Sequence, residues 1–116
     1  KRNYRKWQNT VDSYLKRYII NFVSRGNSMN TLDTQQQLFA ITAEECGELT
    51  QVCMKILRKA NVDATWNKRL LEEVGDVYCM LDLIVQHGYL NWDDIIDRSN
   101  VKKQKLSKWS NLIKET

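Results

Sequence analysis

The fold is decided by residues 38–57, which read Leu-Phe-Ala-Ile-Thr-Ala-Glu-Glu-Cys-Gly-Glu-Leu-Thr-Gln-Val-Cys-Met-Lys-Ile-Leu. Apolar side chains recur in this stretch at the spacing of one helix face, and they are Leu38, Leu49, Val52, Cys53, Ile56 and Leu57. Glu45 falls at the edge of that apolar stripe, and Glu48 lies just beyond it. Because an ionised carboxylate at the edge of a core is costly unless it is paired or bound to a metal, the stretch predicts an amphipathic helix that also carries a binding site.

A second stretch, residues 70–85, repeats this placement of acids on an apolar helix. Its predicted stripe consists of Leu70, Val74, Val77, Tyr78, Leu81, Ile84 and Val85. Glu73 stands at the border of the stripe and Asp76 outside it, so that Glu73-Val74-Gly75-Asp76 matches Glu45-Cys46-Gly47-Glu48. The i, i+3 spacing puts both carboxylates of a pair on one helix face, about 5–6 Å apart. Two such pairs brought together form a cluster that suits hard divalent cations.

Both acidic pairs flank their stripes on the same rotational side, so an antiparallel hairpin of the two helices places them on one side of it. Their register is less regular, because Glu48 lies twelve residues before Ala60 whereas Glu73 lies seven after Trp66. This is a mismatch of roughly 7 Å at ~1.5 Å per residue, which a stagger of the helices has to absorb.

Either acidic pair taken alone is more often a solvated helix face than a site. Besides the position of Glu45, the glycines favour a site. Gly47 and Gly75 each precede the second acid of a pair, and each weakens its helix by up to ~1 kcal/mol relative to alanine. We interpret them as positions that permit close approach of the helices.

Four helices are predicted, over residues 4–23, from 31 or 33 to 60, over 65–87 and over 91–109. Thr31 or Asp33 supplies the N-cap of the second, Gly88 ends the third, and Asn91-Trp92-Asp93-Asp94 resembles a capping box. The chain has no proline, so its helices can run unbroken. We therefore expect one all-α domain over residues 1–116, a four-helix bundle that completes its core by homo-oligomerisation.

Composition indicates a globular protein, with 42% hydrophobic and 28% charged residues. There is no apolar run of membrane-spanning length and no signal-peptide core, so a soluble protein that does not bind membranes is expected. Cys46, Cys53 and Cys79 form no disulfide framework and are expected to be small buried side chains in a reducing compartment. The only histidine, His87, has no nearby ligand pair, which disfavours zinc.

The segments Ala43-Glu44-Glu45-Cys46-Gly47-Glu48-Leu49 and Leu71-Glu72-Glu73-Val74-Gly75-Asp76-Val77 resemble the "EExGEL" and "EELGDV" segments of the MazG-like all-α nucleoside triphosphate pyrophosphohydrolases. The resemblance runs from about residue 38 to 109 and includes Asn91-Trp92-Asp93-Asp94-Ile95 and Lys105-Leu106 in family order. It implies a MazG-like bundle that assembles as a homodimer or homotetramer in the cytoplasm. It also implies Mg²⁺-dependent cleavage of a (deoxy)nucleoside triphosphate to the monophosphate and pyrophosphate.

In such an enzyme the metal ligands would be Glu45, Glu48, Glu73 and Asp76, with Mn²⁺ able to replace Mg²⁺. The metal ions would neutralise the triphosphate and activate a water, which Glu48, or Glu45 in its place, would orient or deprotonate. The predicted substrate-binding residues are Lys55, Lys105, Lys103 and Asn100. Trp7, Trp66 and Tyr78 offer aromatic faces for a base, but the sequence does not select a base or sugar.

Two alternatives stay open. The first is a relative of the dUTPases, whose dimeric forms are longer, or of the phosphoribosyl-ATP pyrophosphohydrolases, whose histidine after the second acidic pair is absent here. The second is a non-enzymatic helical protein that binds nucleic acid or a partner through its basic ends, because the net charge of +4 is concentrated there. Nucleic acid is the less favoured partner, since the acidic motif has no role in binding it.

Overall fold

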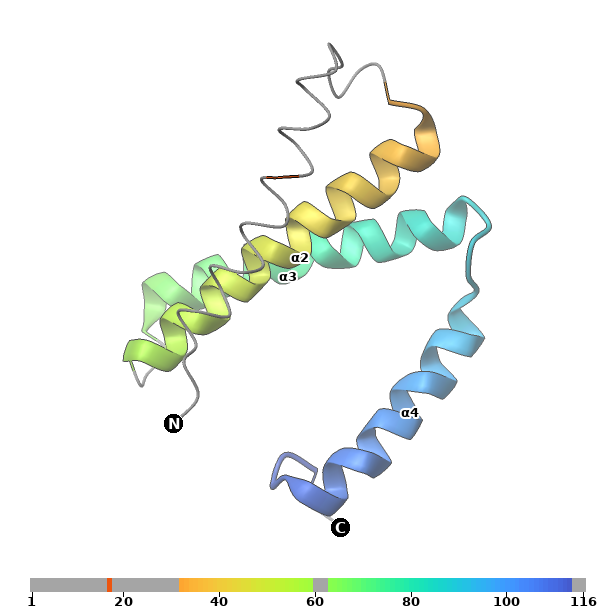
Figure 1. Cartoon of the computed structure of the whole chain (residues 1–116). Coiled ribbons are helices and arrows are strands. Elements are labelled where there is room, and N and C mark those ends of the chain that lie inside the picture. Colours follow the sequence, from red (N-terminus) through yellow and green to blue (C-terminus); the bar gives the residue numbers. More distant parts are fainter. Residues whose placement is uncertain (1–16, 18–31, 60–62, 114–116) are drawn as a thin grey trace. The chain divides into compact units, whose positions relative to one another are not determined.

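The structure is a computed structural model that describes residues 17, 32–59 and 63–113 of the 116-residue chain. The described part contains three helices and no strand: α2 (Thr34–Lys59), α3 (Ala64–Gln86) and α4 (Trp92–Trp109), drawn in Figure 1. The prediction of an all-α protein is therefore confirmed for this part of the chain. The observed bounds of α3 and α4 lie within one or two residues of the predicted ones, and so do those of α2 when Asp33 is taken as its N-cap. The helix predicted over residues 4–23 lies outside the described residues, apart from Arg17.

The chain divides into two compact units, residues 1–83 and 84–116. The first unit contains α2 and most of α3, whereas the second contains the end of α3 and α4. Within the described residues, no helix combines the length and the apolar character that crossing a membrane requires.

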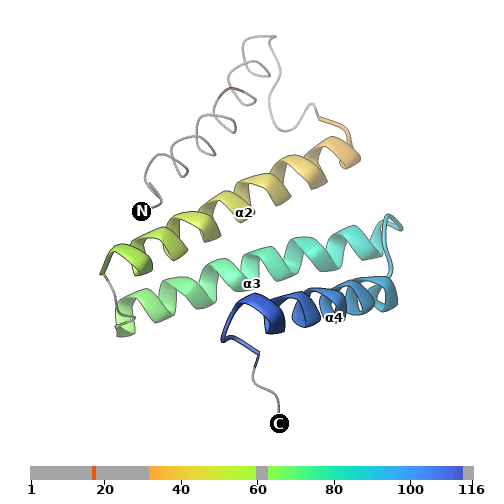
Figure 2. The same ribbon diagram turned by 60° about the horizontal axis from the view of Figure 1, so that its bottom comes forward.

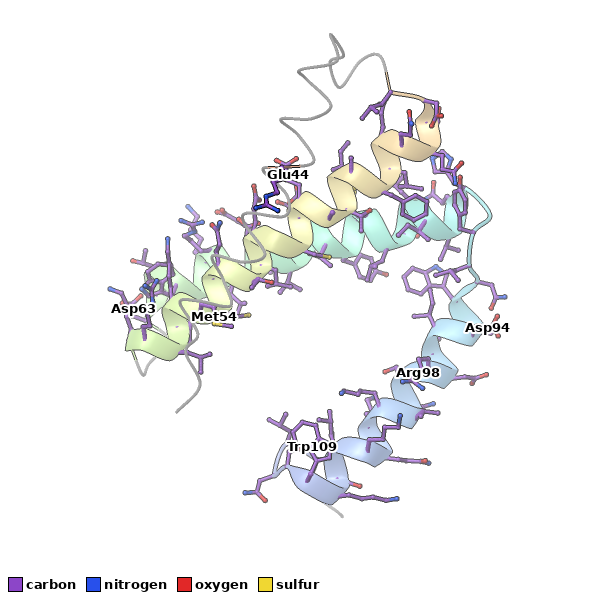
Figure 3. The ribbon with its side chains drawn as sticks, viewed as in Figure 1. Glu44, Met54, Asp63, Asp94, Arg98 and Trp109 are labelled. Carbon is purple, nitrogen blue, oxygen red and sulfur yellow. The ribbon has the colours of Figure 1, made fainter. Side chains whose placement is uncertain are left out.

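Local side chains set where the helices of the first unit begin. The backbone N–H of Gln36 donates to Asp33 Oδ1 (2.7 Å) and the N–H of Asp33 donates to Gln36 Oε1 (3.1 Å), which forms a capping box at the start of α2. Asp63, labelled in Figure 3, stands just before α3 and accepts a hydrogen bond from the N–H of Trp66 (3.0 Å). Asp33 is thus the N-cap of α2, one of the two predicted candidates.

Helices α2 and α3 run antiparallel and side by side in both views (Figures 1 and 2). Their contact face follows a seven-residue spacing, because Leu38, Glu45 and Val52 recur on α2 while Glu73 and Met80 recur on α3. Val52 is fully buried, and Leu38 and Met80 are nearly so. This spacing is typical of a coiled-coil seam, in which each buried Val or Leu contributes about 1.5–3 kcal/mol. Glu45 and Glu73, the first acids of the two pairs, therefore interrupt an otherwise apolar seam.

The predicted apolar stripe of α3 is partly wrong. Val74 and Tyr78, predicted to be core, are 46% and 61% exposed, whereas Glu73, predicted at the border, is only 8% exposed. Apolar residues cover more than half of the circumference of α3, so the helical period alone does not determine which part of this apolar surface is buried. Packing against α2 selects the face with Leu70, Glu73, Val77 and Met80.

Two further expectations are corrected. Among the described residues, Gly75 does not allow close helix approach, because a Cβ atom added there would meet no atom of them within 4 Å. Cys46, Cys53 and Cys79 are free, as expected, but all three are exposed rather than buried. Cys46 follows Glu45 by 100° around α2, which turns it away from the seam and onto the side of the helix.

In the second unit, Gly88 ends α3 with a positive φ of 85°. The N–H of Gly88 donates to the carbonyl of Val85 (2.9 Å) and that of Tyr89 to the carbonyl of Ile84 (3.2 Å), which is a Schellman motif. Asn91 then caps α4 by accepting from the N–H of Asp94 (2.9 Å). The predicted stop at Gly88 and cap at Asn91 are both confirmed.

Candidate metal centre

The antiparallel packing of α2 and α3 brings the four predicted metal ligands together. One carboxylate oxygen from each of Glu45, Glu48, Glu73 and Asp76 lies within 4.8 Å of those from the other three. The expected mismatch in register is smaller than roughly 7 Å, because α3 begins at Ala64 and not at Trp66. Glu48 lies 11 residues before the end of α2 and Glu73 nine after the start of α3, a difference of about 3 Å at 1.5 Å per residue.

The cluster spans a gradient of exposure, from the buried Glu73 through the half-buried Glu45 and Glu48 to the exposed Asp76. Oε2 of Glu45 and Oε2 of Glu73 are buried and have no hydrogen-bond partner among the described residues. The other oxygen of Glu73, Oε1, lies 4.0 Å from Arg69 Nη2, which is a long ion pair. Because a buried carboxylate without a partner is costly, these two oxygens fit a site that holds a cation.

The pKa shifts within the cluster also fit a site that holds a cation. Burial, followed by the negative charges of Asp76, Glu44 and Glu73, raises the pKa of Glu45. Burial also raises the pKa of Glu73, and the neighbouring carboxyl of Glu48 is the next cause. Figure 3 labels Glu44, which is exposed on α2 beside the cluster. Like charges held this close disfavour full ionisation in the absence of a cation.

The donor set fits a hard divalent cation. It consists of carboxylate oxygens alone, with no imidazole or thiolate, and oxygen ligands of this kind suit Mg²⁺ and Mn²⁺ rather than zinc. The exposed side of Asp76 leaves the cluster open to water and to a phosphorylated ligand. The two buried, unpartnered oxygens are the observation on which this fit rests.

A group of basic side chains surrounds Trp66 next to the cluster. The Nζ atoms of Lys59 and Lys55 lie 5.4 Å and 5.6 Å from the ring centroid, and the guanidinium carbon of Arg69 lies 5.9 Å from it. Lys55, Arg58, Lys59 and Trp66 line an open pocket of about 410 Å³. We call this the Trp66 pocket.

The predicted substrate-binding residues are divided between the two units. Lys55 lies in the Trp66 pocket, whereas Asn100, Lys103 and Lys105 are exposed on α4 in the second unit and stay predictions. Arg58 and Arg69 were missed by the sequence reasoning. The signal for Arg58 was the basic run at positions 55, 58 and 59, whose i, i+3 and i+4 spacing places three cations on one side of the helix, whereas no such run marks Arg69.

No protein-family model, no curated protein and no solved structure matches the chain. The residues and their geometry therefore carry the assignment of function.

Proposed function

We propose that the chain hydrolyses (deoxy)nucleoside triphosphates to the nucleoside monophosphate and pyrophosphate in a Mg²⁺-dependent reaction, as its resemblance to the MazG-like enzymes implies. The convergence of four carboxylates, two of whose oxygens are buried and unpartnered among the described residues, is the observation that supports this most. Burying two acids in a helical seam destabilises the fold unless a cation compensates them. The arrangement is therefore better suited to binding than to packing.

When bound by Glu45, Glu48, Glu73 and Asp76, Mg²⁺ or Mn²⁺ would supply the positive charge that neutralises a triphosphate and acidifies water. In the reaction, a water oxygen forms a bond to the α-phosphorus, and the bond from that phosphorus to the oxygen bridging to the β-phosphorus breaks. The electron pair of the broken bond leaves with pyrophosphate.

We assign the proton of the attacking water to a carboxylate oxygen of Glu48. Glu48 is half-buried, so its exposure is intermediate between that of the buried Glu73 and that of the exposed Asp76, and water can reach it. Glu45, which lies one turn earlier on α2, is the second candidate for this role. Glu73 is buried beneath them, which suits a ligand better than a proton acceptor.

We also propose that the complete fold is a MazG-like four-helix bundle, that it assembles as a homodimer or homotetramer, and that it works in the cytoplasm. Assembly is supported by large apolar side chains on α2 and α3 that are more than half exposed, such as Leu57 at 53% and Leu71 at 71%. Contiguous exposed apolar surface on a soluble protein commonly marks an interaction site.

The test is pyrophosphate release from a panel of common nucleoside and deoxynucleoside triphosphates in the presence of Mg²⁺. Glu48→Gln and Asp76→Asn are expected to lower the turnover rate by roughly 10²-fold or more, because each removes a negative ligand and the first removes the proton acceptor. Glu72→Gln is the matched control, since Glu72 is an exposed acid on α3, the helix of Asp76, and lies outside the cluster.

Absence of pyrophosphate release from every nucleotide would overturn the proposal, as would full activity of both cluster variants. Salt-sensitive binding of nucleic acid that survives loss of the four acids would favour the basic, non-enzymatic alternative. Circular dichroism of each variant establishes that a loss of activity is not a loss of the helical fold.

A further inference from the structure

We propose that the Trp66 pocket binds the pyrophosphate moiety of a phosphorylated ligand. The pocket is lined by Lys55, Arg58, Lys59 and Trp66, on the same two helices as the carboxylate cluster. That the ligand is a nucleoside triphosphate rests on the proposed function, whereas the binding of the diphosphate anion does not.

Within the described residues, the charges of Lys55, Arg58 and Lys59 are not compensated by a carboxylate. Lys55, Lys59 and Arg69 all lie within 6 Å of the centroid of one indole ring, and Arg58 completes the lining. In the described part of the chain no carboxylate forms an ion pair with Lys55, Arg58 or Lys59. Because like charges gathered around one ring repel each other, an anion that carries more than one charge stabilises the arrangement.

The chemistry of the lining selects an anion over a nucleobase. Ammonium and guanidinium groups carry only hydrogen-bond donors, and phosphate oxygens only accept. A base stacked on Trp66 would have to displace cations that already lie 5.4–5.9 Å from the ring centroid. Trp66 thus holds the lysine and arginine side chains in place by cation–π contacts, and it is a positioning residue.

The position of the pocket fits a ligand that also reaches the carboxylates. Lys55 follows Glu48 by seven residues on α2, and Trp66 precedes Glu73 by seven on α3, so the pocket begins about 10 Å along the hairpin from the cluster. Arg69 connects the two places, because its guanidinium group lies 4.0 Å from Glu73 Oε1 and also packs over Trp66. A ligand with one phosphorus at the cluster can therefore extend its remaining phosphates toward Lys55 and Lys59.

The experiment is isothermal titration calorimetry of the full chain with inorganic pyrophosphate, at low ionic strength and with EDTA to remove divalent cations. Wild type is expected to bind, and Lys59→Gln is expected to weaken binding roughly tenfold, the usual effect of losing one charged hydrogen-bond donor. Lys68→Gln is the matched control, because Lys68 is an exposed lysine on α3 outside the pocket. Trp66→Leu is expected to weaken binding less than Lys59→Gln, since it removes only the positioning of the cations.

Failure of pyrophosphate to bind, or equal affinity of wild type and Lys59→Gln, overturns the subsite. Tighter binding of a nucleoside monophosphate than of pyrophosphate, with the same dependence on Lys59, also overturns it by making the pocket a site for the nucleoside. Because the titration contains no divalent cation and involves no turnover, its result is separate from the activity panel. Lys59-dependent pyrophosphate binding without nucleotide hydrolysis would refute the proposed function and leave an anion site in place.

Discussion

Glu73 occupies a position on the seam of α2 and α3 where spacing alone calls for an apolar side chain. It is 8% exposed, its Oε2 has no hydrogen-bond partner in the described structure, and its Oε1 lies 4.0 Å from the guanidinium group of Arg69. Leu70, Val77 and Met80 surround it along the same face of α3. A buried carboxylate without a compensating cation destabilises the fold, so under the proposed metal binding the energetic effect of Glu73 should reverse when a divalent cation is added.

The burial of Glu73 also gives a prediction about how stability depends on pH. Burial and neighbouring carboxylates raise the pKa of Glu73 above 4.5, so the folded chain retains a proton that the unfolded chain has released. The stabilisation from that proton is complete below pH 4.5 and is lost as the pH rises through the raised pKa. In EDTA, Glu73→Gln should therefore be more stable than wild type at neutral pH, and the difference should shrink toward acidic pH. Urea unfolding across this range measures it.

Added Mg²⁺ should stabilise wild type in the same experiment and have little effect on Glu73→Gln, because the variant lacks a charged ligand. Titration of Glu45, whose pKa is raised by burial and then by the charges of Asp76, Glu44 and Glu73, contributes a slope of the same sign to both proteins, and this slope is smaller in the variant because the charge of Glu73 is gone. A variant that is less stable than wild type at neutral pH in EDTA would indicate that the charge of Glu73 is already compensated within the protein.

At the scale of the helices, the sequence predicted what depends on nearby residues and missed what depends on packing. Asp33, Gly88 and Asn91 set helix ends through contacts within a few residues, and each was identified in advance. The meeting of the two acidic pairs followed from their matching flanks. The buried face of α3 and the Trp66 pocket could not be predicted from the sequence, because both depend on the register between α2 and α3, which a single helical period does not specify.

Gly75 within α3 and Gly88, which follows the end of α3, are expected to respond oppositely to alanine. Gly75→Ala should raise the free energy of unfolding by about 0.5–1 kcal/mol, because the helix gains propensity and the new Cβ meets no atom within 4 Å. Gly88→Ala should lower it by about 1 kcal/mol, because φ at Gly88 is +85°, a conformation that L residues adopt at a cost. Thermal and urea denaturation measure both. A loss of stability in Gly75→Ala would mean that another element or a second copy of the chain packs on that side of α3.

For the molecule as a whole, the α2–α3 hairpin has two unlike sides. Glu48 and Asp76 lie on the first side, because each follows a seam residue (Glu45 or Glu73) by three positions, or 300° around its helix. Cys46 and Val74 lie on the second side, because each follows the same seam residue by one position, or 100°. The second side we call the apolar flank, which consists of Phe39, Cys46, Cys53 and Leu57 on α2 and Leu71, Val74, Tyr78 and Leu81 on α3. Because the two acid positions face each other across the seam, self-association through the apolar flank leaves the carboxylate cluster open to substrate.

Substitutions on the apolar flank should therefore change the proposed assembly and leave the proposed metal site intact. Wild type is expected to have a solution mass of two or four times 13.7 kDa by light scattering, and Leu57→Glu or Leu71→Glu should shift it toward 13.7 kDa, because a buried unpaired carboxylate opposes association. Lys68→Glu is the matched control, an equally exposed charge change on α3 outside the flank. Stabilisation by Mg²⁺ should persist in the flank variants, since none of the four acids is altered. If wild type were monomeric at 13.7 kDa, or if only Lys68→Glu dissociated it, the apolar flank would not be the surface of assembly.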